Sequence, residues 1–190
     1  MGAQRPDAER QSPSGHGVRE KVGREASPSA GAIDSQSVKT TEAGGPRGFD
    51  AGKKIKARKR HILVDTQHNL LGSIVHGAEM QDRDGAQSIL ASTSSRYPWL
   101  RHVFADGGYA GDKLRKALKS NGGWTIEIIE RSDAAKGFVP LPRRWVVERT
   151  FAWIGRFRRL AKDFKATIES AVAWVLVAHI RRLVRRLAIP

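Results

Sequence analysis

The order in which strand-like and helix-like segments follow one another constrains the fold of this chain most. Apolar or alternating runs predict five strands, at residues 33–39, 61–66, 70–78, 100–105 and 124–131. The residues between the second and third runs, Gln67, His68 and Asn69, predict a hairpin turn. Helical patterns follow the third, fourth and fifth runs, at residues 85–94, 112–120 and 143–160. This alternation predicts an α/β fold.

The order strand, strand, strand, helix, strand, helix, strand, helix is that of the ribonuclease H-like fold. We therefore expect a mixed five-stranded sheet flanked by helices, and 39% hydrophobic residues are enough for one core. Residues 31–190 would form this domain, which ends in a basic helix at 167–188. Residues 1–30 are rich in Gly, Pro, Ser, Arg and Glu and have almost no apolar periodicity, which predicts a disordered leader or remnant.

Glu148 lies in the middle of the helical pattern at 143–160. At about 100° per residue, the apolar side chains gather on one side of this helix and Glu148 faces the other way. Its own face carries Arg144, Ala152, Gly155 and Arg159. Two interpretations follow: a solvated helix face with ordinary ion pairs, or a metal-binding carboxylate within a phosphate-binding surface.

Two aspartates occupy strand positions that meet Glu148 in this fold. Asp106 ends the fourth apolar run and is followed at once by Gly107 and Gly108, and open α/β sheets bind ligands at such strand ends. Asp34 alternates with its neighbours in the first run, where a turn or edge position would also explain it. The ribonuclease H-like order brings all three carboxylates to one edge of the sheet. Such carboxylates hold two divalent ions about 4 Å apart for phosphoryl transfer.

The charge of the chain indicates a polyanionic partner. Lys and Arg number 34 against 19 Asp and Glu, a net charge of +15, which favours nucleic acid. The run at 53–60 predicts phosphate contacts by Lys53, Lys54, Lys56, Arg58, Lys59 and Arg60, although lysines also protect exposed sheet edges. The helix adds Arg144, Arg149, Arg156 and Arg159. Arginines 181, 182, 185 and 186 suit a helix C-terminus and are also available to DNA.

Several other polar and aromatic residues have a structural explanation. Asp84 is a plausible N-cap, and solvent exposure accounts for Asp82. We expect the tryptophans at helical positions to be core residues and the histidines to be structural, since the histidines show no metal-ligand spacing. The longest apolar run, 170–180, is too short to span a bilayer, and no signal peptide or cysteine is present. These features predict a cytoplasmic protein with no membrane partner.

Five segments of the chain resemble the DDE transposases of bacterial insertion sequences: IDSQSVKTT, KARKRHILVDT, HGAEMQDRDGA, VFADGGYAG and LPRRWVVERTFAWIGRFRRLAKD. They run from Ile33 to Asp163. The resemblance implies a nuclease and strand transferase that uses Mg²⁺, or Mn²⁺ in its place, at the ends of a mobile DNA element. It also implies a nucleoid-associated bacterial protein, and a homodimer when two ends are held together.

The resemblance assigns the metal ligands residue by residue: Asp34 first, Asp106 second and Glu148 third. Arg144 matches the arginine of the related Y-R-E-K signature. Leu141 stands at the tyrosine position and Gly155 at the lysine position, so Arg156 or Arg159 would supply the basic contact.

Members of this family usually carry a helical N-terminal region of roughly domain size that recognises the element ends. Asp34 follows only 33 residues here, so we expect a truncated or frameshifted product. Two functions stay open: a metal-dependent transposase catalytic domain, and a catalytically inactive DNA-binding remnant or regulator of transposition.

Overall fold

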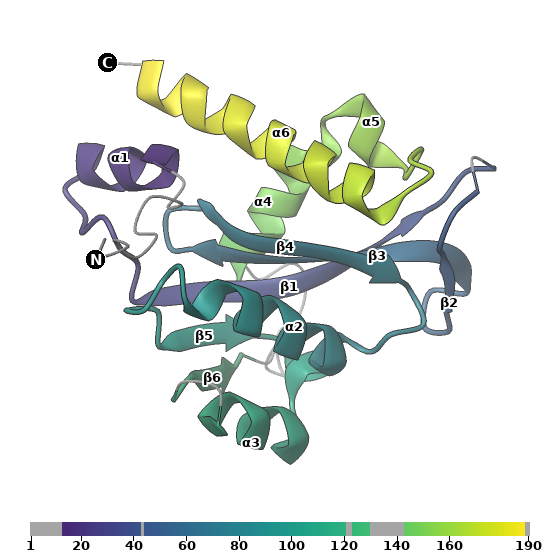
Figure 1. Ribbon diagram of the computed structural model, residues 1–190, viewed down its shortest axis with the longest axis horizontal. Coiled ribbons are helices and arrows are strands. Elements are labelled where there is room, and N and C mark those ends of the chain that lie inside the picture. Colours follow the sequence, from purple (N-terminus) through teal and green to yellow (C-terminus); the bar gives the residue numbers. More distant parts are fainter. Residues whose placement is uncertain (1–12, 43, 121–122, 130–142, 189–190) are drawn as a thin grey trace, which may run out of the picture.

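The computed structural model describes residues 13–42, 44–120, 123–129 and 143–188. Its central sheet has the strand order β2-β3-β1-β5-β6, with β4 paired to β3 (Figure 1). The strands are β1 (Ala30–Lys39), β2 (Gly48–Asp50), β3 (Ile55–Asp65), β4 (Leu70–Gly77), β5 (His102–Ala105) and β6 (Thr125–Ile128). The pairs β1/β3, β2/β3 and β3/β4 are antiparallel, and β1/β5 and β5/β6 are parallel. The mixed sheet is the one that the element order predicts.

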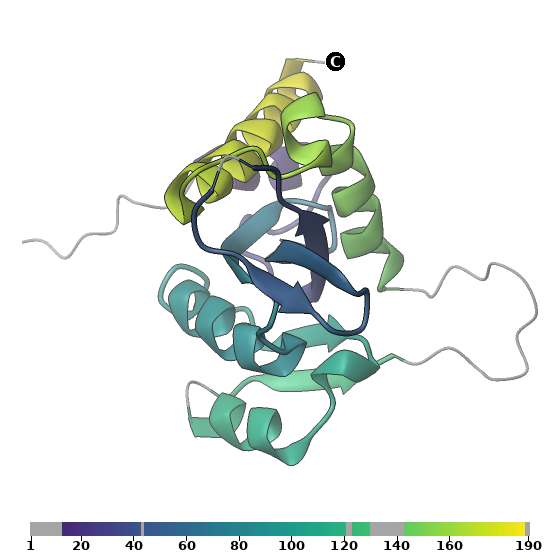
Figure 2. The same ribbon diagram turned by 90° about the vertical axis from the view of Figure 1, so that its right-hand side faces the viewer.

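Helices cover both faces of the sheet (Figure 2). They are α1 (Pro13–Lys21), α2 (Asp82–Ser94), α3 (Asp112–Ser120), α4 (Trp145–Gly155), α5 (Arg158–Ala161) and α6 (Ile168–Ala188), with a short 3₁₀ turn, η1, at Gly107–Tyr109. Helices α2 and α3 pack on one face, and α4, α5 and α6 on the other. None of the described helices combines the length and the hydropathy needed to cross a bilayer.

Alternation along the strands builds the two hydrophobic layers. On β1, Ile33 belongs to the layer under α2 and α3, while its neighbour Ala32 belongs to the layer under α4 and α6. On β3, Leu63 contributes to the first layer and Ile62 and Val64 to the second. Successive side chains of a strand point to opposite faces. The apolar runs of the central strands are therefore continuous because both faces are covered.

The expected disordered leader is wrong for residues 13–30. Helix α1 packs against α6, its Val18 is buried, and residue 30 already belongs to β1. Arg19 of α1 forms an ion pair of 2.8 Å with the fully buried Asp65 of β3. This helix has no apolar periodicity, because Val18 is its one large apolar residue, so its stability comes from tertiary contacts. Residues 1–12 lie outside the described part of the chain.

Three further details differ from the predicted elements. The sheet gains a sixth strand, β2, which lies in a Gly- and Pro-rich segment for which no strand was predicted. Helix α2 begins at Asp82 with Gln81 at its N-cap, so the assignment of Asp84 as the N-cap is wrong. The helix predicted at 143–160 is interrupted, because Phe157 adopts an extended conformation between α4 and α5.

Candidate active site

Strand pairing brings Asp34 and Asp106 to the same edge of the sheet. The parallel strands β1 and β5 pair in register as far as Ala32 and Phe104. Asp34 and Asp106 each lie two residues beyond that pair. Helix α4, which carries Glu148 in its first turn, packs against β1. The three predicted carboxylates therefore come from three neighbouring elements.

One guanidinium group links two of these carboxylates. Nη2 of Arg144 lies 3.6 Å from Oδ2 of Asp106 and 3.2 Å from Oε1 of Glu148. Arg144 is also among the charges that act on Asp34. Its Nε is buried and has no hydrogen-bond partner among the described residues. Arg144 is thus the positive centre around which the three carboxylates gather, and it keeps one donor for a further acceptor.

Asp34 is the carboxyl group whose charge this environment disfavours most. Its pKa is raised to about 7, chiefly by burial and further by the negative charges of Asp106 and Glu148, while the backbone N–H of Ser35 and the charge of Arg144 limit the rise. The N–H of Ser35 donates to Oδ1 over 2.7 Å. A carboxylate held among like charges is stabilised by an added cation. Asp34 therefore has the electrostatics of a cation ligand.

The three carboxylates fit a hard divalent cation by their chemistry, because Mg²⁺ and Mn²⁺ prefer oxygen ligands. In the side-chain arrangement of the described residues, no three Asp, Glu, His or Cys side chains converge closely enough to coordinate one ion. The guanidinium of Arg144 lies between Asp106 and Glu148 instead. A metal ion would compete with Arg144 for these oxygens.

The turn after β5 fixes the carboxylate of Asp106. Oδ1 of Asp106 accepts a hydrogen bond from the N–H of Gly108 over 2.9 Å and so caps η1. A Cβ atom added to Gly108 would lie 3.0 Å from this oxygen and 3.2 Å from Oδ2 of Asp82. Glycine is favoured here because any Cβ would press against two carboxylates that approach the backbone at the same point.

Asp82 is a neighbour of the cluster that the sequence did not indicate. Its Oδ1 accepts a hydrogen bond from the hydroxyl of Ser35 over 2.7 Å and forms an ion pair of 3.0 Å with Lys59. Ser35 follows Asp34 directly, so Asp82 helps to hold the backbone beside the first predicted ligand. Asp84, two residues later, contacts the exposed Lys113 instead. No sequence signal separates these two aspartates, because both lie in the first turn of α2.

Buried side chains of one tyrosine and two histidines pack next to the carboxylate cluster. The hydroxyl of Tyr109 lies 3.2 Å from Nδ1 of His61, and the ring of His61 lies 4.8 Å from that of His76. Burial lowers the pKa of His61 to about 3, so this imidazole is neutral at physiological pH. The charge of Asp34 contributes to raising the pKa of Tyr109. These histidines are structural, as their spacing predicts.

Two of the predicted phosphate contacts are wrong because their side chains point into the protein. Arg58 and Arg60 lie on β3 and are 0% exposed. Arg58 donates to the carbonyl oxygens of Pro46, Lys165, Ala166 and Thr167, and Arg60 to that of Leu160. Both also pair with buried Asp163, at 3.5 and 3.8 Å. These guanidinium groups tie the sheet to the segment between α5 and α6.

The other basic side chains of this run differ in exposure. Lys59 is almost fully buried and pairs with Asp82 beside the cluster, so it is not free to contact DNA as predicted. Lys53, Lys54 and Lys56 are exposed around the β2–β3 turn. They stay candidates for phosphate contacts.

Three of the predicted DNA-binding arginines are exposed: Arg149 on α4, Arg156 just after α4, and Arg159 on α5. Arg149 lies over the rings of Trp145 and Trp153, 5.1 Å from each centroid, and Arg159 lies over Trp174 at 5.2 Å. The predicted core role is wrong for Trp145, whose side chain is exposed, and holds only in part for Trp153 and Trp174, which are half-buried. The rings of all three support surface arginines.

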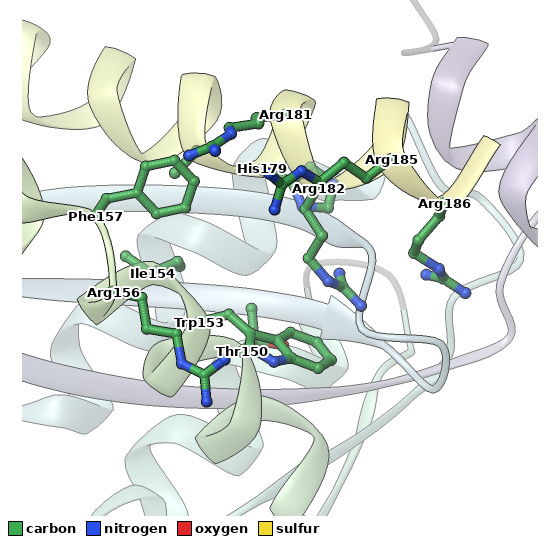
Figure 3. Close-up of a pocket in the computed structure, with 11 residues that line it drawn as sticks. Thr150, Trp153, Ile154, Arg156, Phe157, His179, Arg181, Arg182, Arg185 and Arg186 are labelled. Atoms are coloured by element: carbon green, nitrogen blue, oxygen red, sulfur yellow. The ribbon is translucent and has the colours of Figure 1, made fainter. Parts of the chain in front are cut away.

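A pocket of about 330 Å³ opens between α4 and α6 (Figure 3), and Glu148 is not among the residues that line it. Its α4 side consists of Thr150, Trp153, Ile154, Arg156 and Phe157. Its α6 side consists of Ala178, His179, Arg181, Arg182, Arg185 and Arg186. The sequence indicated a basic end of α6 but not that it faces α4 across a cavity.

Comparison with known proteins identifies the family. A family model described as "Transposase DDE domain" matches residues 25–183. The chain is 32% identical over 114 residues to a curated protein of Burkholderia cepacia, the putative transposase for insertion sequence element IS402. That match covers 56% of this chain and 53% of the relative, so the chain spans about half the length of the relative.

Solved structures show the same arrangement of elements. A chain in the cryo-EM structure of the simian T-cell lymphotropic virus intasome in complex with PP2A regulatory subunit B56 gamma aligns with a TM-score of 0.54 and 14% identity. That alignment covers 80% of this chain and 47% of that one. The catalytic core domain of BIV integrase aligns with a TM-score of 0.49 and 18% identity, covering 78% and 81%. The first of these alignments, at 14% identity, concerns the fold alone, which is ribonuclease H-like as the element order predicts. Because the family model matches most of its length, the chain belongs to the transposase DDE domain family.

Proposed function

We propose that this chain catalyses metal-dependent cleavage and transfer of DNA strands at the ends of an insertion sequence. The observation that carries the proposal is the gathering of Asp34, Asp106 and Glu148, from β1, the end of β5 and α4, around one guanidinium group. The net charge of +15 favours DNA as the substrate. Family membership supports the same reaction class.

In this proposal Asp34, Asp106 and Glu148 hold Mg²⁺, which Mn²⁺ can replace. When bound, the divalent ions would activate the attacking oxygen and stabilise the leaving oxygen of a phosphodiester. The chain's own residues do the positioning. Asp82 holds Ser35 and the backbone beside Asp34, and the turn at Gly108 holds Asp106.

Arg144 has two roles in the proposed site. Without a metal ion it offsets the charges of Asp106 and Glu148. Its guanidinium group, which lies beside two of the three carboxylates, would also donate to a phosphate oxygen of the substrate. Guanidinium groups bind phosphate in a planar, directional way, so Arg144 would orient the DNA strand relative to the carboxylates.

The test is nicking of supercoiled plasmid in Mg²⁺ or Mn²⁺, with EDTA as the metal-free control. We expect nicking by the unaltered chain, no nicking in EDTA, and a loss of at least about 100-fold in rate for Asp106→Asn. Asp84→Asn is the matched control. It also removes one carboxylate, from the first turn of α2, but that carboxylate pairs with exposed Lys113. Nicking that persists in Asp106→Asn would contradict the proposed role of this residue.

One observation favours a second function, a DNA-binding remnant or regulator without catalytic activity. Arg144 neutralises two of the three carboxylates, and no three metal-ligand side chains among the described residues converge on one point. This second function predicts DNA binding that Asp106→Asn leaves intact, with no nicking in either metal. The same plasmid assay, with a binding measurement beside it, decides between the two functions.

A further inference from the structure

The pocket between α4 and α6 concentrates positive charge away from the proposed active site. Five of its eleven lining residues are arginines, and none is acidic: Arg156, Arg181, Arg182, Arg185 and Arg186. The carboxylate that acts on Arg182 and Arg186 is Asp65, which is fully buried and already paired with Arg19. His179 accepts a hydrogen bond from the N–H of Leu70 and its pKa is lowered to about 4, so it adds no charge.

The arginines of this pocket fall into two groups. Arg182 and Arg186 are partly buried and donate to the carbonyl oxygens of His68 and Gln67, which fixes them in place. Burial and the neighbouring charge of Arg186 lower the pKa of Arg182 to about 10. Arg156, Arg181 and Arg185 are exposed, and none of them pairs with a carboxylate among the described residues. The exposed group is available to a ligand.

The aromatic rings of the pocket hold guanidinium groups in place. Arg182 lies 4.0 Å from the centroid of the Trp153 ring, and Arg181 lies 5.3 Å from that of Phe157 (Figure 3). Arg149 also lies over Trp153, at 5.1 Å. A stacked guanidinium keeps its N–H edge free for a phosphate, whereas a ring already covered by arginine is less able to stack on a base. The pocket therefore offers phosphate recognition.

We propose that this arginine pocket, lined by Trp153, Phe157 and the five arginines named above, is a second DNA-binding site that grips the phosphate backbone of a duplex. Its volume of about 330 Å³ is that of a small-ligand pocket and accommodates a phosphodiester group. Its lining includes neither Glu148 nor Arg144, so the pocket is separate from the carboxylate cluster. The proposal shares with the proposed function only the identity of the ligand as DNA.

The test compares two double variants that each remove two exposed positive charges. Arg181→Gln with Arg185→Gln alters the pocket, and Arg96→Gln with Arg101→Gln is the control, at exposed positions before β5. Binding of a short fluorescein-labelled duplex of arbitrary sequence is followed by anisotropy over a range of salt concentrations. Each lost phosphate contact lowers the salt slope by about 0.9. We expect the pocket variant to bind more weakly and to lose roughly 2 from the slope, with little change in the control.

The outcomes separate this proposal from the catalytic one. Equal slopes for the two double variants would overturn the arginine pocket, whatever the plasmid assay gives. A loss confined to single-stranded DNA would also overturn it, because that result would mean that bases stack on the rings. Asp106→Asn should retain the unaltered slope even if no nicking is found. Should the pocket variant melt early, Arg156→Gln with Arg185→Gln tests the same pocket from both helices.

Discussion

Burial of Asp34 beside Asp106 and Glu148 makes the stability of the folded, metal-free chain depend on pH. The pKa of Asp34 is raised from 3.8 to about 7 on folding. Between these values the folded chain holds a proton that the unfolded chain has released, so its stability falls as the pH rises through this window. A shift of this size corresponds to a loss on the order of 4 kcal/mol above pH 7.

Asp34→Asn removes this cost because the amide stays neutral. We expect the variant to be more stable than the unaltered chain at about pH 8 without metal, and the advantage to shrink toward pH 4. Urea unfolding at several pH values measures the difference. Asp84→Asn should show no such trend. If unfolding free energies of Asp34→Asn and the unaltered chain change in parallel with pH, Asp34 does not have the raised pKa.

For single residues, the sequence pattern predicts which acidic residues lie at strand ends, but not which side chains pack beside them. Asp34, Asp106 and Glu148 were predictable because the element order places them at one edge. Asp82 was not, because its contact with Ser35 depends on how α2 lies against β1. Arg58 and Arg60 were misassigned because charge along a sequence does not reveal burial, and their partners are carbonyl groups about 100 residues away.

Among the helices, α1 allows a direct test of whether it belongs to the folded domain. Its Arg19 pairs with Asp65, whose carboxylate is completely buried and also accepts from Gln67 and Asn69. Removal of one partner from a buried pair costs about 3–5 kcal/mol, because the other charge is left without compensation. We expect Arg19→Met to lower the free energy of unfolding by about this amount in a urea titration. Arg24→Met, at an exposed position just after α1, is the control.

Equal stability of the two arginine variants would mean that α1 does not dock on the sheet in solution. Strand β4, helix α6 and residues 61–65 of β3 were predictable because their own residues carry the pattern, whereas residues 55–60 of β3 were interpreted as an exposed basic run. The short elements α1 and β2 were not, since nine and three residues respectively are too few to show a period. Their structure depends on partners that are distant in sequence.

In the molecule as a whole, helix α4 contributes to both proposed sites. It carries Glu148 of the carboxylate cluster, and its residues Thr150, Trp153 and Ile154 line the arginine pocket. A net charge of +15 favours non-specific DNA binding under either proposed function. What distinguishes a transposase domain from a general DNA-binding protein is the use of its few clustered carboxylates.

Binding of a divalent cation by these carboxylates can be measured by titration of Mn²⁺ followed by electron paramagnetic resonance. Bound Mn²⁺ is lost from the signal of the free ion. We expect the unaltered chain and Asp84→Asn to bind Mn²⁺. Binding should strengthen as the pH rises through about 7, because Asp34 must lose its proton. The double variant Asp34→Asn with Asp106→Asn should show no such binding. Equal Mn²⁺ binding by the double variant and the unaltered chain, or no binding by either, would mean that Asp34, Asp106 and Glu148 do not form a divalent-cation site.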